Sequence, residues 1–144
     1  MKKIIPILLV AVLALTGCQN KNPYAGKYTG TFTFVTDNVS KNGTMQFSTN
    51  PLTGDLLLYS VIPLTSTSST TYVSNSGALQ YLTTLLEAMG NTNNIYNSVT
   101  EKIQDVAITT EFSGSTVNAV VQYKIEVLGT LDTYITIVKF TGSR

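Results

Sequence analysis

The chain has 144 residues, with nine Lys and Arg against eight Asp and Glu, and it contains no His and a single Cys. This composition excludes a Ser-His-Asp triad, a Cys-His dyad and the common zinc sites. The near-neutral charge also lacks the basic footprint of a nucleic-acid-binding protein. We therefore expect a protein that is not an enzyme, with no metal site, no cofactor and no nucleic-acid partner.

The first residues follow the order of an export signal. Lys2 and Lys3 precede an apolar run over residues 4–15, and small residues come next. The run has about a dozen residues, fewer than the roughly 20 that a helix needs to cross a bilayer. It therefore predicts a signal peptide over residues 1–17 rather than a transmembrane helix.

The motif Leu15-Thr16-Gly17-Cys18 ends this signal. It resembles the lipobox of bacterial lipoproteins, with a leucine three residues before the cysteine and two small residues between them. The resemblance implies that the signal is cleaved before Cys18 and that Cys18 is acylated, for example with palmitate. Gln19 follows instead of Asp, which in such proteins points to the outer membrane, facing the periplasm. An ordinary signal peptide with an incidental cysteine is the alternative.

The remaining chain divides into a short tether and one domain. Residues 18–25 are polar and include a proline, which suits a lipidated tether. At about 3.3 Å per residue, the reach of this tether is at most about 25 Å. Residues 26–144 are enough for a single domain with its own core, and too few for two.

The first half of this domain has the period of two that β-strands show. Inward positions Tyr28, Phe32 and Phe34 alternate with threonines, which predicts a strand with one buried face. The Asn42-Gly43 pair suits a tight hairpin turn before a second strand over residues 44–48. Residues 56–62 are apolar on both faces and predict a third strand.

One segment in the middle has helical spacing. Leu79, Leu82, Leu86 and Met89 recur within residues 77–89, which predicts a helix. Ser74 or Ser76 would cap its start, and Gly90 would end it. The Ser- and Thr-rich residues 65–76 before the helix predict an exposed loop, and residues 99–105 after it predict a short helical turn.

The last part of the chain predicts three further strands, over residues 106–112, 117–127 and 131–140. Their connections are short, as in an antiparallel meander. The expected fold is therefore α+β and mainly antiparallel β: a curved sheet or partly open barrel of about six strands, with one central helix.

A family resemblance rests on the start of the domain, Tyr24-Ala25-Gly26-Lys27-Tyr28-Thr29-Gly30-Thr31. This segment resembles the first strand of small lipocalin-like or calycin-like lipoproteins of Bacteroidetes-type bacteria. Lipocalins proper carry Gly-x-Trp where this chain has Gly26-Lys27-Tyr28. The resemblance implies a lipid anchor followed by a β domain, and it assigns no binding residue.

Two functions fit these features. In the first, the protein binds a small apolar or glycan-like ligand in an interior pocket whose wall includes Tyr28, Phe32 and Tyr123. In the second, the domain is solid and acts through its surface, as an adhesin, inhibitor or envelope assembly subunit. Glu101 and Asp105 could form a hydrolase-like carboxylate pair, but a solvated helix end explains them better.

The lipobox leads to a direct test. We expect Cys18→Ser to abolish metabolic labelling with a fatty acid, and to leave the chain uncleaved or released from membranes, because the acylated thiol is lost. Membrane fractionation and the mass of the N-terminal peptide measure both effects. A Cys18→Ser product of mature size that still partitions with membranes would contradict the lipoprotein interpretation.

Overall fold

The computed structural model describes residues 21–35, 38–75, 77–89, 103–125 and 134–144. The predicted signal peptide, residues 1–17, and the lipidation site Cys18 lie outside these ranges. The described chain is mainly antiparallel β with one short helix. Its elements are β1 (Gly26–Phe34), β2 (Val39–Thr49), β3 (Leu56–Leu58), β4 (Ile62–Ser66), β5 (Thr71–Ser74), η1 (Ala78–Tyr81), α2 (Leu82–Ala88), β6 (Ile103–Ser113), β7 (Thr116–Ile125) and β8 (Tyr134–Ser143).

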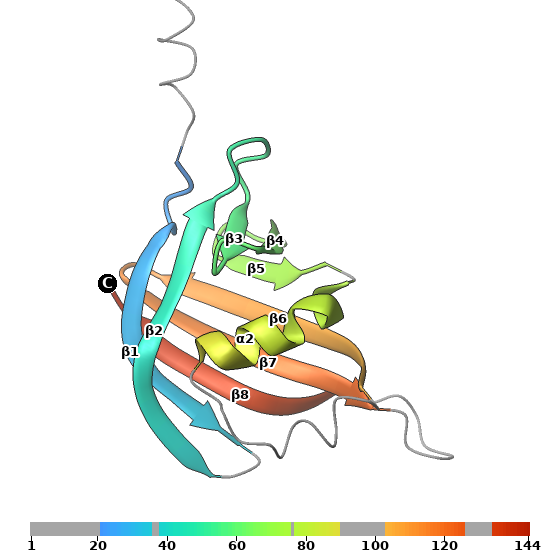
Figure 1. The fold of residues 1–144 in the computed structure, drawn as a ribbon. Coiled ribbons are helices and arrows are strands. Elements are labelled where there is room, and N and C mark those ends of the chain that lie inside the picture. Colours follow the sequence, from blue (N-terminus) through green and yellow to red (C-terminus); the bar gives the residue numbers. More distant parts are fainter. Residues whose placement is uncertain (1–20, 36–37, 76, 90–102, 126–133) are drawn as a thin grey trace, which may run out of the picture.

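The strands form a closed barrel in sequence order (Figure 1). Each strand pairs with the next in antiparallel register, and β1 pairs with β8 to complete the ring. The expectation of about six strands in a curved sheet or partly open barrel was thus right in class and wrong in detail: the structure has eight strands and the barrel is closed.

The first additional strand comes from residues 56–62, which the sequence predicts as one strand. They form a hairpin instead, with Leu56 opposite Leu64 and Leu58 opposite Ile62. Tyr59 and Ser60 make the turn with φ values of 49° and 65°. Two consecutive positive φ angles match the twist of a tight hairpin, but neither residue is the glycine or asparagine that usually marks one.

The second additional strand lies in the Ser- and Thr-rich segment, where the sequence predicts a loop. Thr71, Tyr72 and Val73 pair with β6, and β5 also pairs with β4. The Ser68 hydroxyl accepts hydrogen bonds from the backbone N–H groups of Thr70 and Thr71, which closes the hairpin before β5. Threonine is β-branched and favours strands where a neighbouring strand is available. The polar composition of the segment therefore led to the prediction of a loop where β5 forms.

The Asn42-Gly43 pair is not a turn, contrary to the sequence prediction. Gly43 lies inside β2 opposite Gly30 of β1. A Cβ atom at Gly43 would lie 2.7 Å from the Phe32 ring, so the missing side chain leaves room for that ring. The glycine therefore serves packing rather than a turn, and β2 begins at Val39 instead of Thr44.

The predicted helix is confirmed, but its caps are not. It begins as the 3₁₀ turn η1 and continues as α2 up to Ala88. The residue before η1 is Gly77, at φ 104°, and it makes no side-chain cap. Ser74 instead accepts a hydrogen bond at its hydroxyl from the Ile108 N–H of β6. Ser76 and Gly90 lie outside the described residues.

The short strands explain where the helix packs. β3 pairs with β2 over residues 47–49, and β5 pairs with β6 over residues 109–111. The rest of β2 and the first half of β6 therefore lie beyond the reach of β3 and β5. The helical segment lies across this part of the barrel, and η1 contacts β6 (Figure 1). Leu82, Leu85 and Leu86 are buried there in the same core as the strand side chains.

Two smaller predictions also need correction. Residues 103–105 belong to β6 and not to a helical turn, while residues 99–102 lie outside the described ranges. Part of the predicted tether belongs to the folded domain, since Asn22 and Ala25 are buried against the barrel.

The predicted inward row on β7 is confirmed for the residues whose side chains are described. Its buried members are Val117, Ala119, Val121 and Tyr123. The side chain of Ile125 and all of Val127 lie outside the described set.

Glycines allow the barrel to close between β1 and β8. Gly30 lies opposite Gly142, and a Cβ atom on Gly30 would fall 2.0 Å from the Thr141 carbonyl oxygen and 2.5 Å from the Gly142 Cα. A Cβ atom on Gly142 would fall 2.5 Å from the Phe140 ring. At Gly30 the backbone of β8 takes the space of a methyl group, and at Gly142 the Phe140 ring of the same strand takes it.

We expect Gly30→Ala to lower the free energy of unfolding by about 2–3 kcal/mol, because the new methyl group overlaps backbone atoms that cannot move separately from the strand. Thr29→Ala, at the neighbouring exposed position, is the control and should change stability by less than about 0.5 kcal/mol. Urea denaturation followed by circular dichroism measures both. Equal stability of the two variants would show that the strands can separate at this point.

Candidate functional site

One end of the barrel interior is filled by aromatic rings. Phe112 is at the centre: its ring stacks on Tyr24 with 4.4 Å between centroids, and it meets Phe47 at 5.2 Å. Tyr28 and Tyr72 contact the same ring at 5.7 and 5.9 Å. Such separations are typical of favourable aromatic pairs. The cluster combines β1, β2, β5 and β6, so it stabilises this end of the barrel.

The residues predicted to bind a ligand belong to the packed interior. Tyr28 is 0% exposed and Phe32 is 1% exposed, with the Phe32 ring 4.5 Å from that of Phe140. A side chain with no accessible surface touches neither bulk solvent nor a cavity that holds water. Tyr123 is 8% exposed on β7. The structure places the three side chains in one core. Ligand binding by them stays a prediction.

The polar atoms of this core have partners within the protein. The Tyr28 hydroxyl donates to the Tyr24 carbonyl oxygen at 3.1 Å, and the Thr110 hydroxyl donates to the Tyr72 carbonyl oxygen at 3.2 Å. Burial raises the pKa of Tyr28, and the nearby Arg144 guanidinium partly opposes this effect. The Tyr28 hydroxyl therefore stays neutral and acts as a structural donor rather than an acid or base.

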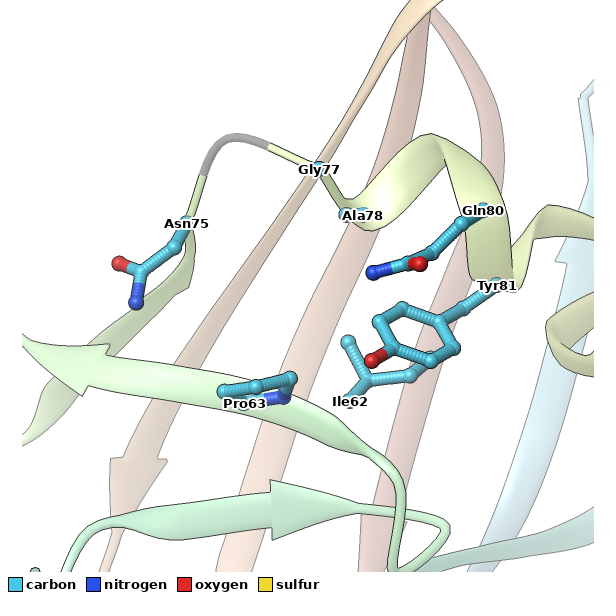
Figure 2. Close-up of a pocket in the computed structure, with 7 residues that line it drawn as sticks. All are labelled: Ile62, Pro63, Asn75, Gly77, Ala78, Gln80 and Tyr81. Carbon is cyan, nitrogen blue, oxygen red and sulfur yellow. The ribbon is translucent and has the colours of Figure 1, made fainter.

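A pocket lies between the start of the helical segment and β4 (Figure 2). Gln80 and Tyr81 extend from η1 above Ile62 and Pro63, and Asn75 lines the pocket from just beyond the end of β5. The cavity volume is about 60 Å³. Small-molecule sites usually measure at least about 300 Å³, and one water occupies about 30 Å³ of liquid. The pocket can therefore seat the edge of a ligand but cannot enclose one.

Local structure explains why these side chains meet. Gly77 adopts φ 104°, which lets the chain turn sharply from β5 into η1 and brings Gln80 and Tyr81 above β4. Asn75 is oriented by the Thr65 hydroxyl, which donates to Asn75 Oδ1 at 2.8 Å. The buried Ile62 side chain thus forms an apolar floor of the site. The Tyr81 ring and the amide groups of Asn75 and Gln80 lie around it. This combination can stack on a ring and hydrogen-bond to hydroxyl groups.

Of the two acidic candidates, Glu101 and Asp105, the structure describes only Asp105. Asp105 is a structural acceptor: its Oδ2 accepts from the Tyr134 hydroxyl at 2.5 Å, and its Oδ1 accepts from the Val106 N–H at 2.8 Å. Its proposed partner Glu101 lies outside the described residues. Among the described residues, no three His, Cys, Asp or Glu side chains gather in a way that could hold a metal ion.

A search of the described helices finds none with the length and apolar character needed to cross a bilayer.

Comparison with protein-family models, with curated proteins and with solved structures finds no match for this chain. The site must therefore be interpreted from its own chemistry. A closed eight-stranded antiparallel barrel is consistent with the lipocalin-like resemblance, because lipocalins are barrels of this kind.

The pocket residues carry little signal in the sequence. No motif marks the pocket residues near the predicted start of the helix, which are Asn75, Gln80 and Tyr81. Pro63 directly follows the apolar residues 56–62, which the sequence predicts as one strand. The one available signal was Gly77, a residue that often allows a sharp change of direction. The pocket could be found only once β4 was known to be a separate strand.

The partly buried hydroxyl of Tyr59 predicts a pH effect. The hydroxyl donates to the Thr44 carbonyl oxygen at 3.2 Å, and burial raises the pKa of Tyr59 well above its ordinary value of 10.0. The folded protein therefore holds this proton more tightly than the unfolded chain. Its contribution to stability is complete below pH 10 and is lost as the pH rises further.

We expect Tyr59→Phe to lose about 1 kcal/mol at neutral pH, because one hydrogen bond is removed. Above about pH 10, its stability should fall less steeply than that of the unchanged protein. Urea denaturation at a series of pH values measures both slopes, and the other tyrosines contribute equally to the two curves. Parallel curves above pH 10 would mean that the hydroxyl is open to solvent.

Proposed function

We propose that this protein is a lipid-anchored component of the bacterial envelope that binds a glycan-like ligand, without catalysis, in the pocket between β4 and η1. The anchor rests on the lipobox motif ending at Cys18. The ligand class rests on one observation: the pocket combines the Tyr81 ring with the amides of Asn75 and Gln80. The proposed location is the outer membrane, facing the periplasm.

The chemistry of the pocket supports a sugar more than a purely apolar ligand. A sugar ring presents C–H groups on its face, which pack on an aromatic side chain such as Tyr81. Its hydroxyl groups both donate and accept hydrogen bonds, as amide side chains do. An apolar ligand would displace water from these amides without replacing the hydrogen bonds that the water made. The small volume also fits contact with one edge of a sugar at the end of a larger glycan.

A second candidate is a surface-acting interaction protein, and a specific observation favours it. Four large apolar side chains lie near the ends of β1, β2 and β8, at the same end of the barrel. Each is between 40% and 44% exposed: Val35, Val39, Tyr134 and Ile135. Exposed apolar side chains that gather in one region often mark contacts with other proteins. In this alternative, the packed interior serves as a rigid support for an envelope protein partner.

One experiment separates the two candidates. We expect Tyr81→Ala to weaken binding of saccharides about fivefold, because an aromatic contact contributes about 1 kcal/mol. Tyr134→Ala, the same change at an exposed tyrosine of β8 that does not line the pocket, should leave this binding unchanged. Titration of a panel of neutral and N-acetylated oligosaccharides, followed by NMR shifts of the Gln80 side-chain amide, provides the measurement.

Two results would argue against the glycan proposal. Shifts that spread over the whole barrel, or binding that is equal in Tyr81→Ala and Tyr134→Ala, would exclude this pocket as the site. Loss of an envelope protein partner in Tyr134→Ala, without any saccharide binding, would support the surface-acting alternative.

A further inference from the structure

Residues 22–25, a few positions after the proposed lipid anchor, are hydrogen-bonded to one end of the barrel. The Asn22 backbone N–H donates to the Thr49 hydroxyl at 2.9 Å, and its side-chain amide donates to the Gly54 carbonyl oxygen at 3.2 Å and to the Tyr72 hydroxyl at 3.1 Å. Asn22 is 8% exposed. This segment is therefore part of the folded domain rather than a flexible spacer.

The C-terminal residue holds the same segment from the other side. The Arg144 guanidinium donates to the Pro23 carbonyl oxygen at 2.7 Å and to the Ala25 carbonyl oxygen at 2.9 Å. It also lies 5.4 Å from the centre of the Tyr28 ring. Hydrogen bonds from a charged donor are stronger than neutral ones. The N-terminal segment is thus fixed by both β2 and the end of β8.

This attachment limits the distance between the domain and a membrane. Cys18 precedes Asn22 by four residues in the sequence. Four residues span at most about 14 Å, roughly half of the 25 Å reach expected from the tether as predicted. If Cys18 carries lipid, as the proposed function requires, the barrel end that contains Asn22 must face the bilayer at close range.

The turn between β2 and β3 extends from this same end. Figure 1 shows it beside the N-terminal segment, pointing away from the barrel. Leu52, near the middle of the turn, is 92% exposed, by far the most exposed of the large apolar residues in the described chain. An apolar side chain presented in this way loses unfavourable contact with water when it enters a lipid surface.

The turn is built to hold Leu52 outward. The Gly54 N–H donates to the Asn50 carbonyl oxygen at 2.8 Å, and the Asn50 N–H donates to the Asp55 carbonyl oxygen at 2.7 Å. Asn50 Oδ1 also accepts from the Leu52 N–H at 2.9 Å. The Asn22 side-chain amide donates to the Gly54 carbonyl oxygen, so this turn is attached directly to the N-terminal segment.

We propose that the β2–β3 turn is a membrane-contact element that inserts Leu52 into the lipid surface carrying the anchor of the same chain. Lys21 and Lys27, both exposed, lie at this end of the barrel and would face lipid phosphates. The contact fixes the orientation of the domain and turns the exposed apolar residues at the opposite barrel end away from the membrane. The inference rests on the proposed lipidation of Cys18.

The absence of tryptophan from the chain permits a clean test. Leu52→Trp places one fluorescent probe on the turn, and Val39→Trp places a matched probe at the other end of β2, about 33 Å away along the strand. Val39 is also exposed, at 41%. The full chain is produced in a lipoprotein-processing bacterium and reconstituted in vesicles of phosphatidylethanolamine and phosphatidylglycerol, with or without lipids brominated near the glycerol end.

We expect the Leu52→Trp emission to shift to shorter wavelength and to be quenched by the brominated lipids, whereas the Val39→Trp emission stays as in water. The mass of the N-terminal peptide is measured on the same samples. An acylated Cys18 with an unquenched, water-like Leu52→Trp probe overturns the inference and leaves the anchor intact. A peptide without acyl groups overturns the proposed anchor, and the membrane contact with it. Quenching of both probes equally would also overturn the inference, because it shows no preferred orientation.

Discussion

The close contact between β1 and β8 is the constraint on which the rest of the structure depends. Gly30 of β1 lies between Gly43 of β2 and Gly142 of β8, so three neighbouring strands have no side chain at one level of the barrel. The Phe32 and Phe140 rings occupy the space that these glycines leave. Closure removes the two free edges that an open sheet would expose. It also gives the interior a fixed diameter, which in an eight-stranded barrel is just wide enough for side chains to fill.

The short strands β3, β4 and β5 then determine where the helix packs and where a ligand can bind. They complete the wall at the end of the barrel where Asn22 is bound, and the helical segment buries its leucines where they do not reach. Because the aromatic and aliphatic side chains fill the described interior, the proposed binding site lies where the helix meets β4 rather than inside the barrel. The same packing makes the barrel a rigid support for residues on its surface.

The N-terminal segment is where the proposed lipid anchor would join this architecture. Asn22 joins the turn between β2 and β3 to Tyr72 of β5, and Arg144 joins it to the chain end after β8. Strands from both halves of the barrel therefore hold the residues next to the proposed anchor. A lipid on Cys18 would orient the whole domain, so the two barrel ends would have different surroundings: one facing lipid, the other facing the periplasm.

The sequence alone determined the elements whose signal is local. The period of two in β1, β6 and β7 and the leucine spacing of the helix follow from burial of one face, and the structure confirms them. The lipobox is also a local motif, and it stays a prediction.

Tertiary structure decided the hairpin at Tyr59 and Ser60, the pairing of Thr71 and Val73 in a strand, and the place of Gly43 inside β2. Each of these depends on a partner distant in the sequence: a neighbouring strand, or a ring that needs space. The pocket depends on such partners too, because Tyr81 and Pro63 lie close together only in the folded barrel. Pairing between strands that are distant in the sequence leaves no periodic pattern from which the pocket could be predicted.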